Sequence, residues 1–128
     1  VPAPAPARPA RVLIVEDSPD AAESMELLLR LLGHETRVAG TGPEGVRAAS
    51  EFSPDVVLCD IGLPGFDGYE VARRVRAMPG LEGVLMVAVS GYAGEEDRRR
   101  GREAGFHHHL AKPADPSDIQ RMLAARAG

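Results

Sequence analysis

The chain lacks the residues and patterns that mark several common protein classes. Its 128 residues include one cysteine, Cys59, so an internal disulfide is excluded and a reducing, cytoplasmic setting is the default expectation. No apolar run approaches the roughly 18 residues that span a bilayer, and no signal-peptide pattern opens the chain. The formal net charge of −4 gives no general attraction to nucleic acid or to an anionic membrane. These features favour one non-membrane domain.

The first ten residues differ in composition from the rest. Residues 1–10 are almost entirely proline and alanine, which keeps a segment extended and outside a packed core. We expect a linker over 1–10 and one folded domain over 11–126. A leader of this kind, without an initiator methionine, suggests a module of a longer protein.

Short apolar runs alternate with segments of helical periodicity along the rest of the chain. Each run is strand-length and β-branched, and each helical segment carries apolar residues at spacings of three and four. Right-handed crossovers between such units produce a parallel sheet with helices on both faces. We therefore predict an α/β fold: a flavodoxin-like, doubly wound, five-stranded sheet of order 2-1-3-4-5. The predicted strands are 12–15, 34–39, 56–60, 84–89 and 109–111, and the predicted helices are 19–32, 43–51, 68–78, 95–103 and 117–126.

Four of the predicted strands run into a side chain suited to phosphoryl chemistry. These side chains are Glu16 with Asp17, Asp60, Ser90 and Lys112. The carboxyl ends of parallel strands share one edge of the sheet, so these residues converge there. Asp60 is the candidate nucleophile, because a carboxylate can attack phosphorus and form an acyl phosphate. Lys112 and Ser90 can contact the phosphoryl oxygens.

A divalent cation is needed at this edge, because the negative charge of Asp60 repels an incoming phosphoryl group. Clustered carboxylates bind Mg²⁺, which accepts one or two of them together with a phosphate oxygen. We expect Asp17 and Asp60 as direct ligands, Glu16 as a direct or water-mediated ligand, and the backbone carbonyl of Gly62 as a further one. The alternative for any one of these acids alone is a helix N-cap.

The same residues carry a resemblance to a known family. The chain from about 11 to 126 resembles the receiver domains of two-component response regulators and hybrid sensor kinases. The resemblance depends on four motifs in this order and spacing: Val-Glu16-Asp17-Ser18, Cys-Asp60-Ile-Gly-Leu-Pro64-Gly-Phe-Asp67-Gly68-Tyr-Glu70, Val-Ser90-Gly-Tyr-Ala and Ala-Lys112-Pro113.

The resemblance implies a phosphorelay module. In that family the residue matching Asp60 accepts a phosphoryl group from a histidine of a partner kinase, and a histidine phosphotransfer protein is the other expected partner. The acidic pair binds Mg²⁺, and the residues matching Ser90 and Lys112 contact the phosphoryl group. It also implies a cis bond at Lys112-Pro113. We expect the signal to reach the face formed by the fourth and fifth helices, in a monomer or weak dimer.

Two residues are candidates for tuning the response. Many family members have tyrosine or phenylalanine three residues before the lysine, where this chain has His109. We hypothesise that the imidazole makes output less dependent on ring rotation, or sensitive to pH near neutrality. Tyr92, two residues after Ser90, either shields the acyl phosphate from water or covers a loop.

Two clusters admit a functional interpretation that we consider weaker. The histidines 107–109 could bind a transition metal, but neighbouring strand residues alternate faces, which favours an exposed edge strand. The arginines 98–100 and Arg102 could contact nucleic acid, but acidic residues precede them and no base-stacking aromatics accompany them. We interpret that run as a solvated helix face, and expect no direct nucleic-acid or membrane contact.

Three alternative functions remain open from the sequence. An aspartate-nucleophile phosphatase usually has a second acid two residues after the nucleophile, where Gly62 stands here. A flavin-binding flavodoxin would need a hydroxyl- and glycine-rich loop in place of Glu16-Asp17. A degenerate receiver would act by protein binding alone. As a receiver, the chain would carry out phosphoacceptor and autodephosphorylation chemistry only, either alone or as part of a hybrid kinase.

Overall fold

The computed structural model describes residues 9–91 and 94–125 and contains five strands and five helices in strict alternation. Their ends differ from the predicted ones by at most two residues. The strands are β1 Arg11–Val15, β2 Glu35–Ala39, β3 Val56–Asp60, β4 Leu85–Ser90 and β5 His108–Ala111. The helices are α1 Pro19–Leu31, α2 Gly42–Phe52, α3 Gly68–Arg76, α4 Glu95–Ala104 and α5 Pro116–Ala125.

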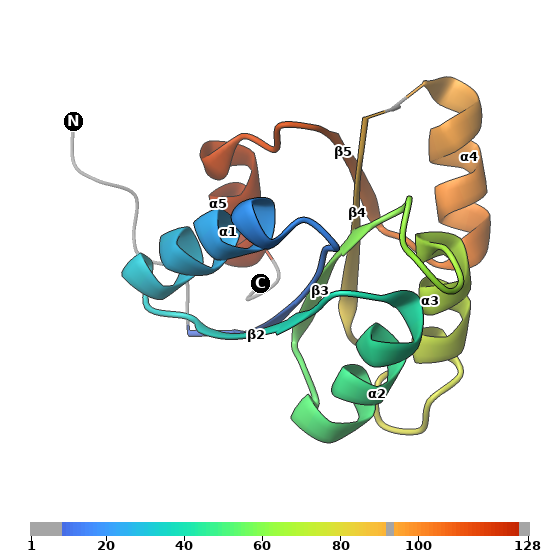
Figure 1. Ribbon diagram of the computed structural model, residues 1–128, viewed down its shortest axis with the longest axis horizontal. Helices are drawn as coiled ribbons and strands as arrows, with labels where there is room; N and C mark the ends of the chain where they lie inside the picture. Colours follow the sequence, from blue (N-terminus) through green and yellow to red (C-terminus); the bar gives the residue numbers. More distant parts are fainter. Residues whose placement is uncertain (1–8, 92–93, 126–128) are drawn as a thin grey trace.

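The strands form one parallel sheet in the order β2-β1-β3-β4-β5, which confirms the predicted flavodoxin-like topology. Helices α1 and α5 cover one face of the sheet, and α2, α3 and α4 cover the other (Figure 1). The order changes direction between β1 and β3, because the chain leaves β1 for an edge and returns beyond it. The carboxyl ends of β1 and β3 therefore lie side by side at the point where this fold binds ligands.

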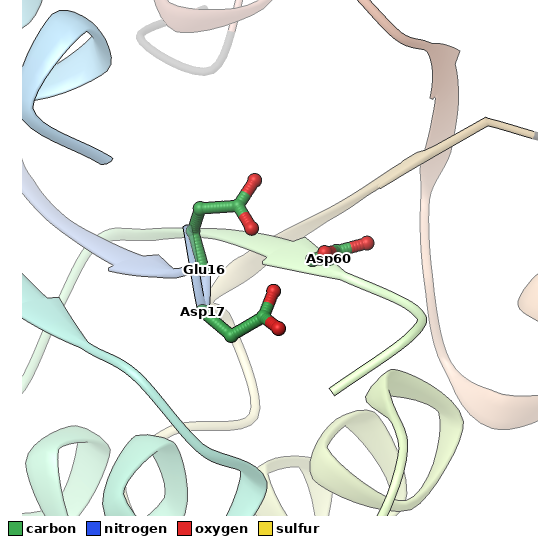
Figure 2. Close-up of side chains that lie close together, drawn as sticks. All are labelled: Glu16, Asp17 and Asp60. Atoms are coloured by element: carbon green, nitrogen blue, oxygen red, sulfur yellow. The ribbon is translucent and has the colours of Figure 1, made fainter. Parts of the chain in front are cut away.

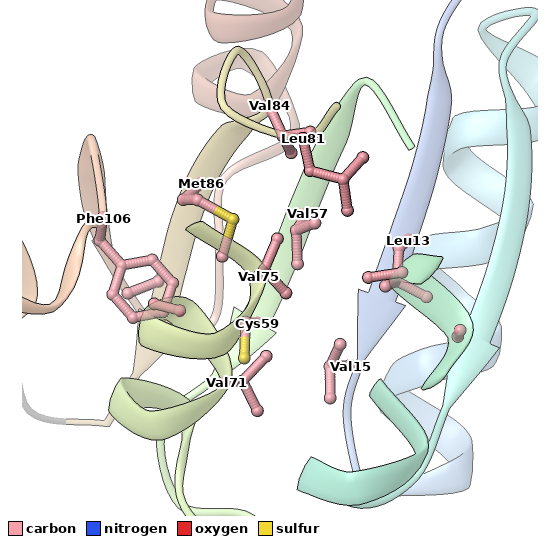
Figure 3. Close-up of a cluster of buried hydrophobic side chains, with 14 of the residues drawn as sticks. Leu13, Val15, Val57, Cys59, Val71, Val75, Leu81, Val84, Met86 and Phe106 are labelled. Atoms are coloured by element: carbon pink, nitrogen blue, oxygen red, sulfur yellow. The ribbon is translucent and has the colours of Figure 1, made fainter. Parts of the chain in front are cut away.

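The core has one apolar layer on each face of the sheet, because alternate strand residues point to opposite faces. The larger layer packs the sheet against α2, α3 and α4 (Figure 3), and it includes Val57, Cys59, Val75, Met86 and Phe106. The smaller layer packs the sheet against α1 and α5. Cys59 is fully buried and burial raises the pKa of its thiol, so the prediction that it is a core residue is confirmed.

The helices begin where short polar side chains accept hydrogen bonds from exposed backbone amides. The Ser18 hydroxyl caps α1, the Thr41 hydroxyl caps α2 and the Asp67 carboxylate caps α3. The first residue of α3, Gly68, also lies unusually close to the sheet. A Cβ atom on Gly68 would be 2.4 Å from the carbonyl oxygen of Asp60, so only glycine fits there.

Helix α4 is the least apolar helix, and it buries only Gly101 and Ala104. The glycine in the middle of α4 faces β5. A Cβ atom on Gly101 would lie 3.4 Å from the Nδ1 atom of His109, so this position faces that ring at contact distance. None of the described helices combines the length and the apolar character that crossing a membrane would require.

The described chain is attached to the sheet from Ala10 onward. Ala10 is 2 % exposed, its amide donates to the Nδ1 atom of the buried His34, and its carbonyl accepts from the amide of Glu35. The edge strand β2 is more open, and its Val38 side chain is exposed.

Candidate functional site

Three carboxylates meet at the carboxyl ends of β1 and β3. Glu16 and Asp17 directly follow β1, and Asp60 is the last residue of β3 (Figure 2). Each offers one oxygen atom, and these three oxygens all lie within 4.8 Å of one another. Asp60 is 9 % exposed, Glu16 is partly buried and Asp17 is open to solvent. We call these residues, together with Ser90 and Lys112, the acidic edge.

The arrangement fits Mg²⁺, which binds hard oxygen ligands and retains waters. The fit rests on the donor set, because each of the three residues supplies a carboxylate oxygen from a partly buried to an open position. An open position on the Asp17 side leaves room for the waters that this cation keeps. Asp17, Asp60 and Glu16 are the residues that would hold it.

Lys112 brings a positive charge from β5 across the sheet edge to these acids. Its Nζ atom donates to Oδ2 of Asp60 and to Oε1 of Glu16, both at 3.0 Å. Burial alone would lower the pKa of Lys112, but its hydrogen bonds to the two carboxylates raise it overall. The ammonium group therefore stays charged beside Asp60, where phosphoryl oxygens would lie in an acyl phosphate.

Glu16 is held in place from two directions. Its Oε1 atom accepts from Lys112, and its Oε2 atom accepts from the amide of Ser18 at 3.2 Å. Burial raises the pKa of the Glu16 carboxyl, and the negative charge of Asp60 adds to this, while the hydrogen bond from Lys112 opposes it. A cation at this edge would favour the charged form further.

The remaining predicted site residues also lie at this edge. Ser90 ends β4 and is 7 % exposed, and its carbonyl accepts from the amide of Lys112 at 2.8 Å. The amide of Gly62 donates to Oδ1 of Asp60 at 3.3 Å. The Lys112–Pro113 bond is cis, as expected. The ends of four strands, β1, β3, β4 and β5, therefore bring these residues to one end of the sheet.

The structure adds two features that the sequence prediction missed. The ion pair between Glu16 and Lys112 was not foreseen, because the prediction assigned Glu16 to the metal alone. Gly68 was quoted only as part of a motif, although its lack of a side chain lets α3 approach Asp60. The signal for the first was the opposite charge of two strand-end residues at one edge.

An apolar groove of about 570 Å³ opens beside the acidic edge. It lies between α1 and the segment that joins β5 to α5, and it reaches Glu16, Asp60 and Lys112. Its walls are mainly apolar, and they include Ile14, Ala21, Met25, Leu28, Pro113 and Ala114.

The structure describes only one of the two residues that we predicted to tune the response. Tyr92 lies outside the described residues. His109 is partly buried at the position expected for a switch aromatic, and both its ring nitrogens are shielded from solvent with no hydrogen-bond partner among the described residues. His107 has another role: its Nδ1 atom accepts from the amide of Met86 at 3.0 Å. The described histidines form no group with the geometry of a metal site.

The chain belongs to the family of response regulator receiver domains. The model of that family, described as "Response regulator receiver domain", matches residues 12–124. Receiver domains take phosphoryl groups from histidine kinases or phosphotransfer proteins, so this chain is a receiver domain of two-component signalling.

Solved structures and curated relatives agree with this assignment. A response regulator from Chloroflexus aurantiacus is 34% identical, with a TM-score of 0.85 over 94% of this chain and 100% of that one. The receiver domain of the sensor histidine kinase PA1611 from Pseudomonas aeruginosa, solved with magnesium coordinated in its active-site cleft, is 32% identical. Its TM-score is 0.85 over 94% of this chain and 99% of that one.

A longer relative places such a domain in a larger protein. The DNA-binding response regulator MtrA of Mycolicibacterium smegmatis is 35% identical over 116 residues, which are 91% of this chain and 50% of MtrA. The chain therefore spans about half the length of that relative.

Proposed function

We propose that Asp60 accepts a phosphoryl group from a phosphohistidine of a partner kinase or phosphotransfer protein in a Mg²⁺-dependent reaction. The observation that carries this proposal is the position of Lys112 Nζ, 3.0 Å from the Asp60 carboxylate at an edge with two further acids. An anionic nucleophile, a cation for the phosphoryl oxygens and a set of metal ligands are thereby brought together.

In the proposed reaction an Asp60 carboxylate oxygen forms a bond to phosphorus as the bond from phosphorus to the histidine nitrogen breaks. The electron pair of the broken bond stays on the leaving imidazole. Lys112 pairs with a phosphoryl oxygen, and Ser90 donates a hydrogen bond to another. Mg²⁺, held by Asp17, Asp60 and Glu16 with the carbonyl of Gly62, would offset the negative charge of the phosphoryl group.

The groove beside the acidic edge suits a partner that presents a helix. A phosphohistidine must approach Asp60 closely, so the surface around it has to match the protein that carries the histidine. The groove between α1 and the β5–α5 segment is apolar and continuous with Asp60 and Lys112. An amphipathic helix can place its apolar side in such a groove. We propose that the partner docks there.

The proposed output is a shift of the α4–α5 face. Lys112 donates hydrogen bonds to Asp60 and Glu16, so a new phosphoryl group changes the partners of the residue that directly follows β5. Strand β5 lies next to α4, and α4 buries little apolar surface. A weakly anchored helix can change its packing at low cost, which suits a population shift that a partner or tethered domain recognises. We propose the proline- and alanine-rich segment before Ala10 as the linker to such a domain; Ala10 itself is buried against the sheet and belongs to the receiver.

The decisive experiment is intact mass spectrometry after incubation with acetyl phosphate and Mg²⁺. We expect one added phosphoryl group, formed as acetate leaves, and its loss when EDTA removes the metal. Asp60→Asn should abolish the adduct. Asp20→Asn, which removes the same charge from an exposed acid of α1, is the matched control and should retain it.

Two results would contradict the proposal. An adduct that survives in Asp60→Asn would place the phosphoryl group on another residue. A folded wild-type protein that forms no adduct with either acetyl phosphate or a histidine kinase would be a degenerate receiver that acts by binding alone.

A further inference from the structure

Residues 61–67 join β3 to α3, and we call this segment the β3–α3 loop. It leads away from Asp60 and includes Gly62, whose carbonyl is one of the proposed ligands of the cation. The amide of Gly62 donates to Oδ1 of Asp60, and the amide of Gly68 donates to the carbonyl of Ile61 at 2.8 Å. These bonds close the loop on itself. The place of its outer residues depends on what they contact beyond the loop.

The first turn of α2 holds the outer side of the β3–α3 loop. Helices α2 and α3 lie side by side on one face of the sheet (Figure 1). The amide of Gly42 donates to the carbonyl of Pro64 at 3.1 Å. The ring of Pro43 lies against Gly65, where an added Cβ atom would be 2.6 Å from Cδ of the proline. Two consecutive residues of α2 thus contact two consecutive residues of the loop.

Phe66, the largest side chain of the loop, completes this contact. A Cβ atom on Gly42 would collide with the carbonyl oxygen of Phe66 and would lie 2.8 Å from Cδ2 of its ring. On α3, Arg74 lies over the same ring, with its guanidinium carbon 4.2 Å from the ring centre. Phe66 is partly buried and packs against the larger core layer. Both helices therefore hold the ring of Phe66.

The arginine over this ring is itself held in place. The Nε atom of Arg74 donates to Oε2 of Glu70, one turn earlier on α3, at 2.8 Å. The hydrogen bonds from Arg74 and then from Arg73 lower the pKa of the Glu70 carboxyl, so this ion pair is charged at neutral pH. The cation therefore has a fixed position over the face of the ring, which attracts it.

A second phenylalanine, at the other end of α2, has similar surroundings. Phe52 is the last residue of α2, and the guanidinium carbon of Arg11 lies 4.4 Å from its ring centre. Phe52 is 7 % exposed and belongs to the same core layer. It lies about 15 Å along the helix from Gly42. Phe52 is thus a matched control for Phe66, at the end of α2 that is distant from the β3–α3 loop.

We propose that Phe66 is a positioning residue for the metal site: it holds the β3–α3 loop on the first turn of α2, and so keeps the carbonyl of Gly62 ready for a divalent cation at the acidic edge. This inference rests on the proposed function, which assigns that carbonyl to Mg²⁺. A ligand already in place binds without the loop losing freedom at that moment. Contacts outside the ligand set commonly change metal affinity by about 10–100-fold.

The test is isothermal titration calorimetry of Mg²⁺ into the wild-type domain and its variants, without any phosphodonor. Phe66→Leu keeps most of the apolar volume and removes the ring that contacts Gly42 and Arg74. We expect it to raise the Kd for Mg²⁺ by about tenfold. Phe66→Tyr keeps the ring and should stay within about twofold of wild type. Phe52→Leu makes the same change at the distant end of α2 and should also stay within about twofold.

Urea titration separates positioning from a general loss of stability. Phe52 is the more deeply buried of the two, so Phe52→Leu should lower the urea midpoint at least as much as Phe66→Leu does. Two exposed changes leave the core intact: Arg74→Met should raise the Kd for Mg²⁺ by about two- to threefold, and Arg11→Met should not. Equal Mg²⁺ affinity in all of these proteins would overturn the proposal. So would equal losses in Phe66→Leu and Phe52→Leu.

Phosphorylation by acetyl phosphate adds a second readout. At saturating Mg²⁺, Phe66→Leu should be phosphorylated at the wild-type rate, because Asp60 and Lys112 are unchanged. A rate that stays low at saturating Mg²⁺ would mean that the ring positions Asp60 itself, and it would overturn the inference.

The same measurements distinguish this inference from the proposed function. A wild-type domain that binds no Mg²⁺ and is phosphorylated without it would contradict both. A wild-type domain that binds Mg²⁺ and forms the adduct on Asp60, with unchanged affinity in Phe66→Leu, would contradict the inference alone.

Discussion

The acidic edge and the arginine pocket differ in how their charged side chains are arranged. The arginine pocket is a cavity of about 360 Å³ bounded by α4, β5 and α5, and Arg98 and Arg102 line it. At the acidic edge Lys112 lies between two carboxylates, and each opposite charge has a partner within 3.0 Å. In the arginine pocket the cations gather on one wall, and the lining acid Asp118 is engaged by Arg121. The first region can exchange one charged partner for another without unfolding anything. The second gathers cations of α4 beside an acid that already has a cationic partner.

The difference shows how a small domain can hold two opposite arrangements of charge close together. Both regions draw on β5: Lys112 directly follows the strand and His109 lies inside it. Three residues along the chain therefore separate the proposed phosphoryl contact from a ring that lines the arginine pocket. The predictions below test whether the two regions are as distinct as their charges indicate.

The largest expected effect compares one cation from each region. Lys112→Met removes the positive charge beside Asp60, and we expect phosphorylation by acetyl phosphate to slow by roughly 100-fold, as for loss of a group that stabilises developing charge. Arg102→Met removes a cation from the arginine pocket, and the rate should stay within about twofold of wild type. Time courses of intact mass measure both rates. Equal slowing in the two variants would mean that the regions are not separate.

A comparison of two glycines should give the next largest effect. At Gly68, an added Cβ atom would lie 2.4 Å from the backbone oxygen of Asp60, and a backbone atom cannot move aside easily. We expect Gly68→Ala to lower the free energy of unfolding by about 2–3 kcal/mol. Urea titration measures this loss. A change below about 0.5 kcal/mol would show that α3 can shift away from the acidic edge.

Gly101 should respond in the opposite sense. There the added Cβ atom would meet Nδ1 of His109 at 3.4 Å, an ordinary contact distance, and alanine favours helix over glycine. We expect Gly101→Ala to raise the free energy of unfolding by up to about 0.5–1 kcal/mol. The same urea titration applies. A clear loss of stability would indicate that the ring of His109 has no freedom to adjust.

The smallest expected effect is a dependence of the free energy of unfolding on pH, which His107 causes. The pKa of His107 is lowered from its ordinary value of 6.5, first by burial and then by the like charges of Arg76 and His108, while the bond from the Met86 amide opposes this. The unfolded chain therefore binds this proton more readily than the folded one.

The free energy of unfolding is therefore expected to decrease in acid. Well above about pH 6.5 the His107 ring is neutral in both states and contributes no penalty, and it lowers the free energy of unfolding as the pH falls through that value. Urea titrations at about pH 7.5 and about pH 5.5 measure the change. His107→Gln should show a smaller fall over the same interval. An identical fall in the variant would assign the dependence to other groups.

The sequence was sufficient for the fold and for the position of the acidic edge, because both follow from apolar runs and the residue after each run. Asp60 and Lys112 follow apolar strands, and the topology of parallel strands brings such positions together. The sequence did not predict what Gly101 does. In a sequence it is a poor helix residue, and only the packing of α4 on β5 shows that it faces the ring of His109.

The same limit applied to the charged residues of α4. Their order along the sequence indicates a solvated helix face, which is correct for Arg99 and its glutamate partners. It does not indicate that Arg102 turns toward α5, because that depends on where a helix distant in sequence packs. Local patterns specify local structure, whereas the composition of a cavity depends on elements that meet only after folding.

Cys59 gives this domain a built-in reporter of its own motions. It is the single thiol of the chain, it is fully buried next to Asp60, and its raised pKa keeps it protonated. A thiol reagent can modify it only when the larger core layer opens, so the labelling rate measures the frequency of that opening. Comparing this rate before and after phosphorylation would show whether the modification of Asp60 tightens or loosens the core, without any label having to be introduced.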